Sequence, residues 1–378
     1  MTNDNYIDVN IPDLTGNEKK YLAECVETGW ISSFGPFIER FEKEMAQLAG
    51  RKHAVALSNG SDALELAVRA LGIGNGDEII IPDFCIISCS QAVVYNQATP
   101  VLVDCHPDTF NMNVNQIESK ITERTKAIMV VHTYGFPVDM DPVLELAKKY
   151  NLKIIEDAAE MHGQTYKGKP CGSFGDISTF SFYPNKHVTT GEGGMVCVDD
   201  DELLKRCQSL RNLCFSPRRF VHDDLGWNMR MSNMQAAIGC AQMERVHDFI
   251  KVKRRAGRYY TEKLQDLQDK VQLPITSTDY ADNIYWVYPL VLKDTVKVDA
   301  IEVMKRFQAL GVGTRPFFYS QHKQPCFIKR GLFTGEETDY PVGARISDRG
   351  FYIPIGTAIT QEQQDRVIEV MKKVFAEL

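Results

Sequence analysis

The sequence lacks the cysteine spacing of a metal site or a disulfide framework. Its ten cysteines are scattered singly through 378 residues, apart from Cys85 and Cys89 in "CIISC", which have neither the CxxC spacing nor a second half. This argues against the common zinc-binding patterns, and no metal is expected. The cysteines are predicted to be buried, reduced thiols.

Long apolar runs and an excess of basic residues are also missing. No stretch approaches the roughly 18 apolar residues of a membrane-spanning helix, and the opening "MTNDNYIDVNIPDL" lacks the basic end and apolar core of a targeting signal. Lysine and arginine number 43 against 50 aspartates and glutamates, a net charge of −7, which argues against nucleic acid as a partner. We expect a cytoplasmic protein that binds neither membrane nor nucleic acid.

The sequence does contain a regular alternation of short β-branched runs and helical patterns. The runs "HAVALS", "EIIIPD", "AIMVVHTYG" and "LKIIEDAA" are separated by patterns such as "SDALELAVRALG" and "DPVLELAKKYN". This alternation is typical of an α/β fold with a mainly parallel sheet flanked by helices. The runs "STFSFY" and "GGMVCVD" predict two further strands.

The length predicts two domains. A helical start, with Thr15 and Glu18 at capping-box spacing, leads into the α/β part, so the large domain is expected to span residues 1–245. A long helical stretch from Asn233 leads to a smaller α+β domain, residues 246–378, where strand and helix patterns alternate.

Two glycine-rich stretches differ in what precedes them. "LGIGNGDEIIIP" places its glycines before a strand, whereas a dinucleotide-binding loop follows one, so it predicts only a tight connection. "LSNGSDALELAV" has the order strand, Asn59-Gly60-Ser61, helix, which predicts an anion seat made by first-turn amides and the Ser61 hydroxyl. Ser61 as a plain helix N-cap is the alternative.

Asp157 and Lys186 add the other requirements of a pyridoxal phosphate site. Asp157 follows an apolar strand, at the edge where open α/β sheets bind ligands, although a carboxylate there can be a simple cap. Lys186 precedes the turn "HVTTGEGG", where a lysine taken alone is more often solvated. The cofactor's phosphate needs amide donors, its pyridine nitrogen an anion and its aldehyde a primary amine. Together the three features indicate this cofactor.

Several segments occur in the order found in a known family. They include "WISSFGPFIERFE", "VALSNGSDALELAV", "IIEDAAEMHG", "GSFGDISTFSFYPNK", "TTGEGGMV" and "WNMRMSNMQAAIG". By these motifs the chain resembles the DegT/DnrJ sugar aminotransferases, which have the fold-type-I fold of pyridoxal phosphate enzymes. The resemblance extends over nearly the whole chain, and "EDAAE" followed by "FSFYPNKHVTTGEGG" is its most specific part.

The resemblance implies a role for each matching residue. Lys186 is implied to carry the cofactor and to shuttle the proton, Asp157 to pair with the pyridine nitrogen, and Glu160 to lie near the ring's phenolic oxygen. The residues implied to hold the phosphate are Gly60, Ser61 and Ser181. Without the resemblance, Ser181 reads as an ordinary strand residue.

The same resemblance implies a homodimer with shared active sites. Asn228, in "GWNMRM", matches an asparagine that family members supply from the neighbouring subunit. Arg230 beside it is a candidate for binding the donor carboxylate. Asn228 as a simple turn former is the alternative.

Two stretches depart from the family pattern. In "PDFCIISCSQAV", Ile86 occupies the place of the aromatic residue that usually stacks on the cofactor ring, so either Ile86 or nearby Phe84 is expected to cover it. Pro184 removes an amide donor and fixes a backbone angle close to Lys186, and His187 has no assigned role. These changes leave the reaction type unaffected and weaken the substrate assignment.

The family implies that L-glutamate donates an amino group to a nucleotide-linked 4-keto-6-deoxysugar. The product would enter a surface polysaccharide, such as a lipopolysaccharide O-antigen or a capsule. The residues that match sugar-facing positions in relatives are Trp30, Ser32, Arg315, Tyr319 and His322. Core packing for Trp30 and a surface ion pair for Arg315 are the alternatives.

Three other functions stay open. The first is the same transfer to a small keto compound, with or without a phosphate, which the changes at Pro184 and His187 motivate. The second is a pyridoxamine-dependent sugar dehydratase, but those enzymes have histidine in place of the lysine, and here the matching residue is Lys186. The third is a regulator without catalysis, for which the chain has no extra DNA-binding part.

Overall fold

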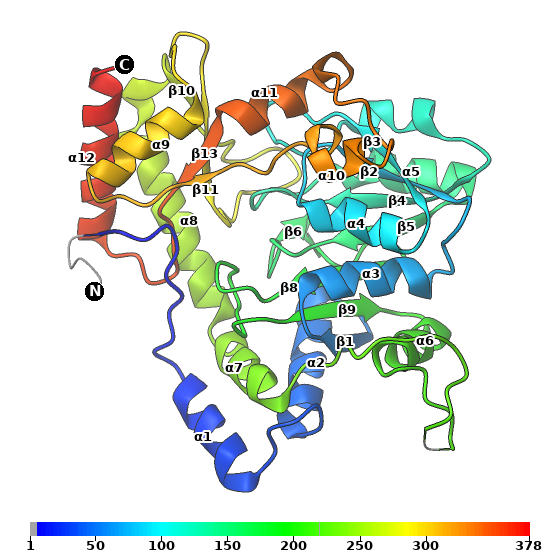
Figure 1. The fold of residues 1–378 in the computed structure, drawn as a ribbon. Helices are drawn as coiled ribbons and strands as arrows, with labels where there is room; N and C mark the ends of the chain where they lie inside the picture. The colour runs from blue at the N-terminus through cyan, green and yellow to red at the C-terminus, as the bar shows by residue number, and fades with distance from the viewer. Residues whose placement is uncertain (1–5, 219) are drawn as a thin grey trace.

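The computed structural model describes residues 6–218 and 220–378, which contain one large, mainly parallel sheet (Figure 1). Its strands are β1 (His53–Leu57), β2 (Glu78–Pro82), β3 (Thr99–Val103), β4 (Thr125–Val131), β5 (Lys153–Asp157), β8 (Ile177–Ser181) and β9 (Gly194–Val198). They lie in the order β1-β9-β8-β5-β4-β2-β3. The strands from β8 to β3 run parallel, whereas β9 is antiparallel to both of its neighbours. The predicted α/β class is confirmed.

The central strands bury side chains on both faces, as their continuous apolar sequences require. In β4, Ile128 and Val130 belong to one core, while Ala127 and Met129 belong to the other. Helices must therefore cover both faces. One face packs against α2 (Pro36–Ala49), α5 (Met140–Tyr150) and α7 (Asn233–Met243). The other packs against α3 (Gly60–Ala70), α4 (Ile87–Tyr95) and α6 (Asp201–Arg211).

The connection between β8 and β9 carries Lys186. The Phe182 amide donates to the Gly193 carbonyl (2.9 Å), so the two strands close into a loop just beyond the end of β8. Parallel strands β4, β5 and β8 end at the same edge of the sheet. Lys186 is therefore brought to the edge where Asp157 ends β5.

A second, antiparallel sheet lies in the C-terminal part of the chain. It contains β10 (Val271–Gln272), β11 (Tyr288–Leu292), β13 (Gly350–Ile353) and β12 (Arg315–Pro316), in this order. Its core includes side chains of α8 (Val246–Lys263), α9 (Ala300–Ala309) and α12 (Gln361–Ala376). Ile7 belongs to the same core, and its amide donates to the Gly311 carbonyl (2.9 Å). The N-terminal segment thus lies against the smaller sheet, and the division between residues 245 and 246 stays a prediction.

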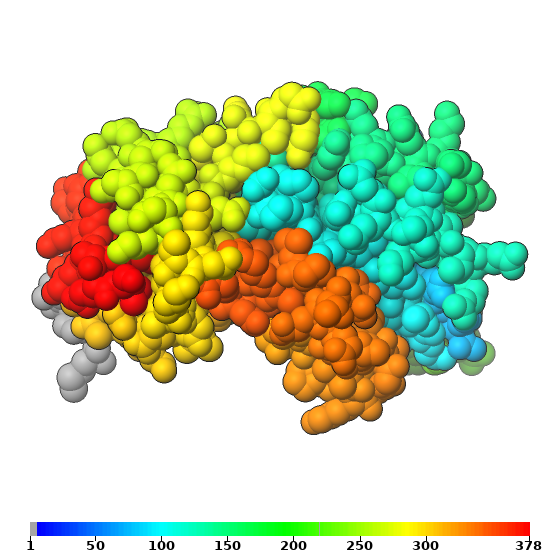
Figure 2. All heavy atoms as spheres, turned by 90° about the horizontal axis from the view of Figure 1, so that it is seen from above, coloured from blue at the N-terminus to red at the C-terminus, as the bar shows by residue number. Residues whose placement is uncertain are grey.

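The chain after β12 returns to the large sheet, and Figure 2 shows this orange segment against the cyan part of the chain. It forms α10 (Pro325–Ile328) and α11 (Pro341–Arg349). The Gln321 side chain donates to the Cys85 carbonyl (2.7 Å) and accepts from Ser90 Oγ (2.7 Å). These bonds fix the loop before α4 against the smaller sheet's part of the chain.

Two helix boundaries differ from the predictions. Helix α1 (Glu18–Thr28) follows Asn17, and the Thr15 hydroxyl donates to Asp13 (2.6 Å) instead, so no capping box forms. The long stretch from Asn233 is interrupted between α7 and α8, where Arg245 Nη2 binds Asp13 Oδ2 (2.6 Å). In the described residues, no helix has the length and apolar character needed to cross a membrane.

Candidate active site

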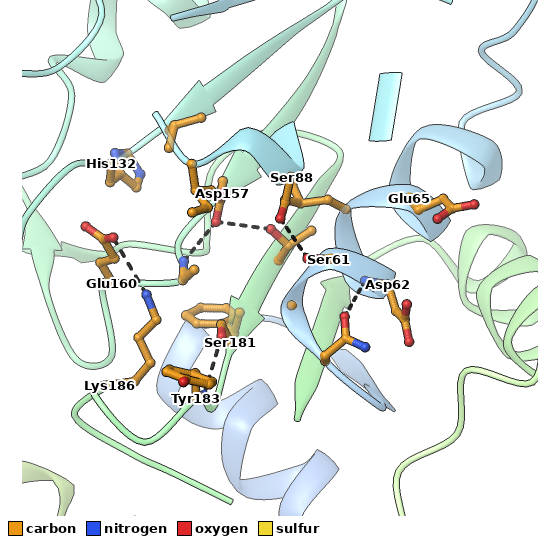
Figure 3. A pocket seen from close by; sticks show the side chains of 18 of the residues that line it. Ser61, Asp62, Glu65, Ser88, His132, Asp157, Glu160, Ser181, Tyr183 and Lys186 are labelled. Atoms are coloured by element: carbon orange, nitrogen blue, oxygen red, sulfur yellow. Dashed lines mark hydrogen bonds and ion pairs between the residues drawn. The ribbon is translucent and has the colours of Figure 1, made fainter. Parts of the chain in front are cut away.

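A cavity of about 720 Å³ opens at the carboxyl ends of β4, β5 and β8, and Figure 3 shows its side chains from close by. The first turns of α3 and α4 and the β8–β9 connection form part of its wall. Trp286, before β11, and Phe318, after β12, complete it from the side of the smaller sheet. Open α/β sheets usually bind ligands at this edge.

Most residues predicted for the cofactor meet in this cavity. Those that line it are Gly60, Ser61, Ile86, Asp157, Glu160, Ser181 and Lys186. They come from five separate stretches of the chain, and only the shared sheet edge brings them together. Their position agrees with the roles that the resemblance implies, and the roles themselves stay predictions.

The Lys186 amine lies between a carboxylate and an aromatic ring. Its Nζ atom is 3.6 Å from Glu160 Oε1 and 3.9 Å from the centre of the Trp286 ring. Burial lowers the pKa of Lys186, while the Glu160 and Asp157 carboxylates act in the opposite direction. An amine whose charged form is disfavoured is available as a nucleophile closer to neutral pH.

Glu160 is fixed beside this amine, as Figure 3 shows. Its Oε2 atom accepts the Tyr134 amide (2.6 Å), and its Oε1 atom faces Lys186. Burial raises the pKa of Glu160 to about 8, against the attraction of Lys186. Near neutral pH Glu160 therefore keeps its proton more readily than an exposed carboxyl group does.

Asp157 ends β5 and turns its carboxylate toward the cavity. Oδ1 accepts the Ala159 amide (3.0 Å) and the Thr179 hydroxyl (3.4 Å), and Oδ2 accepts the Cys89 thiol (3.4 Å). Burial raises the pKa of Asp157, and the nearby Lys186 counteracts it. A cationic ring nitrogen would supply the strong donor that this carboxylate lacks. The site therefore fits the pyridine ring of the cofactor.

Glu156, one residue earlier, has different surroundings. Its carboxylate accepts the amides of Gly172 (2.5 Å) and Phe174 (2.8 Å) and binds His132 Nε2 (3.0 Å). All of these partners belong to the protein, and Glu156 is fully buried. Glu156 therefore holds structure together and does not line the cavity.

His132, Glu156 and Cys171 form a buried group whose possible metal-ligating atoms lie within 4.8 Å of one another. His132 Nδ1 accepts the Val138 amide (3.1 Å), so its other ring nitrogen carries the proton toward Glu156. Hydrogen bonds thus already use the histidine and the carboxylate. No metal site is proposed here.

The first turn of α3, where an anion seat is predicted, lines the cavity. Asn59 is the N-cap, since its side chain accepts a first-turn amide (2.9 Å), and the alternative of Ser61 as the cap is wrong. Ser61 Oγ instead pairs with Ser88 Oγ (2.7 Å). A Cβ atom on Gly60 would lie 2.8 Å from the Ser181 Cβ, so glycine lets the helix start touch β8. Unpaired first-turn amides and three hydroxyls therefore surround a space suited to a phosphate.

Of the two residues predicted to cover the cofactor ring, only Ile86 reaches the cavity. Ile86 lines it and is 39% exposed. Phe84 is fully buried and packs against Tyr134 and Phe317, with ring centres 5.7 and 5.8 Å away. The alternative that Phe84 stacks on the ring is therefore wrong for this arrangement.

The remaining predicted residues lie outside this cavity: Trp30, Ser32, Asn228, Arg230, Arg315, Tyr319 and His322. Trp30 is 51% exposed, which excludes the alternative of core packing. Asn228 and Arg315 are exposed as well. Arg230 is half-buried and donates to Asn212 Oδ1. Within one chain, the exposed side chains of Trp30, Asn228 and Arg315 are available to ligands or partners outside the cavity.

His322 is buried, in contrast to the other predicted sugar contacts. Its Nδ1 atom lies 2.7 Å from Asp83 Oδ1, and its amide donates to the same oxygen (3.0 Å). Because Asp83 follows β2, this pair ties the returning segment to the large sheet. Because Nδ1 faces Asp83, a sugar would have to contact the opposite side of the His322 ring.

Sequence reasoning missed several residues of the cavity wall, among them Ser88, Trp286 and Phe318. Ser88 lies in "PDFCIISCSQAV", the segment that departs from the family pattern and for which Ile86 was predicted. Trp286 and Phe318 lie in "YWVYPLVL" and "TRPFFY", which predict strands. The available signal was a large aromatic residue at the end of each short strand.

Comparison with known proteins agrees with this geometry. The chain matches the DegT/DnrJ/EryC1/StrS aminotransferase family over residues 12–372. It is 43% identical to a GDP-perosamine synthase of Caulobacter vibrioides over 98% of both chains. It is 40% identical to a GDP-perosamine synthase of Escherichia coli O157:H7, over 98% of this chain and 99% of that one.

The fold is similar to that of a solved relative. DesV of S. venezuelae superimposes with a TM-score of 0.88 and 32% identity, over 96% of this chain and 95% of that one. The fold-type-I class is thereby confirmed. The chain belongs to the DegT/DnrJ/EryC1/StrS family and is a pyridoxal phosphate-dependent aminotransferase.

Proposed function

We propose that this aminotransferase moves the amino group of L-glutamate to the keto carbon of a GDP-linked 4-keto-6-deoxysugar. The observation that carries the proposal is the meeting of Lys186, Asp157 and the α3 anion seat in one cavity. The chain's identity to GDP-perosamine synthases supports the choice of nucleotide and sugar. The same likeness favours a nucleotide sugar over a small keto compound as the acceptor.

The residues of the cavity would have separate roles in binding the cofactor and in moving the proton. Pyridoxal phosphate, when bound, supplies an electrophilic carbon and an electron-withdrawing ring. Gly60, Ser61 and Ser181 would hold its phosphate, and Asp157 would supply the anion beside the ring nitrogen. Lys186 would supply the amine that bonds to the cofactor, and it would accept and return the proton that the transfer requires. Glu160 faces that amine at 3.6 Å.

The charges of the cavity support a homodimer with shared active sites. The described lining residues include these carboxylates: Asp62, Glu65, Asp157, Glu160 and Glu192. Lys186 is the one lysine or arginine among those described lining residues. A phosphate, a diphosphate and the donor's carboxylates would add further negative charge, which needs cations nearby. Asn228 and Arg230 of a second copy would supply a donor and a cation.

Exposed apolar side chains support the same arrangement. At the end of α1 and just after it lie Val26, Trp30, Ile31 and Phe34, each more than half exposed. A cluster of this kind on a globular protein usually marks a contact surface. In a dimer it would be covered, and Trp30 and Ser32 would come close to a ligand of the partner copy.

We place the enzyme in the cytoplasm, where it would make an amino sugar for a surface polysaccharide. All ten cysteines are free, and nine of them are buried, as suits a reducing compartment. Relatives named for lipopolysaccharide and spore-coat polysaccharide biosynthesis support the pathway class. An O-antigen and a capsule are both compatible with this role.

Absorbance spectra of the cofactor-loaded enzyme test the proposal. Glutamate is expected to remove the absorbance band of the lysine-bound cofactor, and a GDP-linked 4-keto-6-deoxysugar is expected to restore it. The acceptors compared are GDP-, dTDP- and UDP-linked 4-keto-6-deoxysugars and small phosphorylated ketones. Restoration by a small ketone alone would overturn the sugar assignment, and no response to glutamate would overturn transamination with this donor.

Mixing two inactive variants tests the shared active site. Lys186→Ala and Asn228→Ala combined with Arg230→Ala are each expected to be inactive or weak alone. If each site uses residues of both copies, mixed dimers contain one site with no substitution. Random reassociation would then restore about a quarter of the wild-type activity. Absence of any restored activity in verified mixed dimers would contradict the proposal.

A further inference from the structure

Trp286 brings an aromatic face to the Lys186 amine. The Nζ atom lies 3.9 Å from the centre of the indole ring, and the Trp286 side chain is buried. An ammonium group over an indole face gains a cation–π attraction, which strengthens when water is excluded. The attraction also selects one position for a side chain that otherwise rotates about several bonds.

Two hydrogen bonds fix the position of Trp286. Its Nε1 atom donates to the Asn185 carbonyl (2.8 Å), which belongs to the residue before Lys186. Its backbone carbonyl accepts from Lys253 Nζ (2.8 Å) on α8. The indole is therefore tied on one side to the connection that carries the amine and on the other to a long helix of the smaller sheet's core.

Lys253 is unusual because its buried amine has no carboxylate partner among the described residues. The side chain is fully buried, and the amine donates to the carbonyls of Trp286 and Ile355. Burial lowers the pKa of Lys253 to about 7. A methionine would fill similar space with less desolvation. What the lysine adds is its pair of hydrogen bonds, one of which holds Trp286.

We propose that Trp286 is a positioning residue that holds the Lys186 amine at the cavity. Asn185 and Lys253 fix the indole, and the indole keeps the amine from closing onto Glu160. The present 3.6 Å separation is too long for a strong hydrogen bond between the amine and the carboxylate. Without the indole, the amine is expected to move into direct contact with Glu160 and to be held there. The inference rests on the proposed role of Lys186.

Other ionisable groups act on Lys186 or lie close behind it, and any titration has to account for them. They are Asp157 at the end of β5, Glu160 after it, Cys89 on α4, His162, His187 and Lys253. Burial lowers the pKa of His162 to about 3 and places the pKa of His187 well below its ordinary value. Both histidines are therefore neutral over the pH range of interest. Asp157, Glu160, Cys89 and Lys253 remain, and the control variants address Glu160 and Lys253.

Fluorescence of the cofactor-free protein tests the contact directly. The sequence has three tryptophans, so Trp30→Phe combined with Trp227→Phe leaves Trp286 as the one reporter. In this background the emission of Trp286 is expected to change with pH as Lys186 loses its proton. Lys186→Met is expected to remove that part of the change, whereas Glu160→Gln and Lys253→Met shift or reduce other parts. An identical titration with and without Lys186 would overturn the inference.

Spectra of the loaded enzyme test the consequence. Trp286→Leu is expected to slow the reaction with glutamate about tenfold, and Trp286→Phe, which keeps a ring without the N–H, about threefold. Both substitutions are expected to shift the midpoint of the change in the cofactor's absorbance with pH. Phe318→Leu is the matched control, because it also removes an aromatic wall residue and Phe318 stacks on Trp286 at 6.3 Å. Equal midpoint shifts in Phe318→Leu and Trp286→Leu would overturn the positioning role.

The two failures are distinguishable. If Lys186 does not carry the cofactor, the unsubstituted enzyme shows no lysine-dependent absorbance band, and the proposed function fails. If the band is present and the pH dependence of the Trp286 emission is the same with and without Lys186, the proposed function stands and this inference fails.

Discussion

Adjacent carboxylates at the end of β5 have opposite surroundings. Glu156 accepts two backbone amides and binds the His132 ring, all within 3.0 Å. Asp157 meets one amide at 3.0 Å and two weaker contacts at 3.4 Å, from Thr179 and Cys89. Buried carboxylates are costly unless strongly hydrogen-bonded. The difference teaches that protein donors satisfy Glu156 fully, whereas they leave Asp157 able to accept a further, stronger donor.

Neutralising Asp157 is expected to have the largest effect on activity. Asp157→Asn is expected to lower kcat/KM for amino transfer by about 10³-fold, because an amide cannot supply the anion that keeps the ring nitrogen protonated. Steady-state kinetics with the preferred acceptor measure this loss. The denaturation midpoint of the cofactor-free protein is expected to stay the same or to rise, since a poorly paired buried charge is removed. A similar loss of activity in Glu156→Gln would break the comparison.

Neutralising Glu156 is expected to act on stability instead. In Glu156→Gln the amide nitrogen must face either the Phe174 amide or the side of Gly172 and His132, which sets donor against donor. The free energy of unfolding is expected to fall by about 3 kcal/mol. Urea denaturation of the cofactor-free protein at neutral pH measures this.

Glu118→Gln is the matched control for that stability effect. Glu118 is exposed and pairs with Lys149 at 2.6 Å, so its loss is expected to destabilise the protein much less than the loss of Glu156. Equal effects of the two substitutions would show that the bonds to Glu156 contribute little.

The sequence alone could not assign these two roles. A strand that is buried on both faces has no polar face, so the alternation in "KIIED" does not tell which carboxylate enters the cavity. The resemblance implied that Asp157 is the carboxylate near the cofactor, and in the structure Asp157 lines the cavity. The α/β pattern itself was predictable because each strand and helix has its own local signal. The contact of Trp286 with Lys186 was not, because it depends on how two separate sheets pack.

Helix caps show the same limit on a smaller scale. The order strand, Asn59-Gly60-Ser61, helix predicted an anion seat. The structure confirms this order of elements, and anion binding there stays a prediction. Which side chain caps the helix depends on a two-residue shift in its start, and a sequence pattern does not resolve such a shift. Asn59 caps the helix, so the Ser61 hydroxyl is not needed as a cap and lies at the cavity.

Glu160 lies between the two cases, since it is buried like Glu156 and faces the cavity like Asp157. Its pKa is raised from 4.5 to about 8, mainly by burial. Between those pH values the folded state binds more protons than the unfolded chain, so raising the pH through this window lowers stability. Glu160→Gln is expected to flatten the decline. Urea denaturation of both cofactor-free proteins across the window measures it, and an unchanged slope would show that another group holds the proton.

The smallest effect is expected at Cys89, the weakest of the donors to Asp157. A thiol is a poor hydrogen-bond donor, so Cys89→Ala is expected to lower kcat/KM by no more than about threefold. Cys89→Ser supplies a stronger donor and is expected to lower the pKa of Asp157, which shifts the pH profile of the loaded enzyme to the acid side. Cys207→Ala is the control, because Cys207 is equally buried in the same core and is not one of the donors to Asp157. If Cys89→Ser and Cys207→Ala leave the same pH profile, Asp157 is set by its amide and hydroxyl donors alone, and its contrast with Glu156 becomes larger.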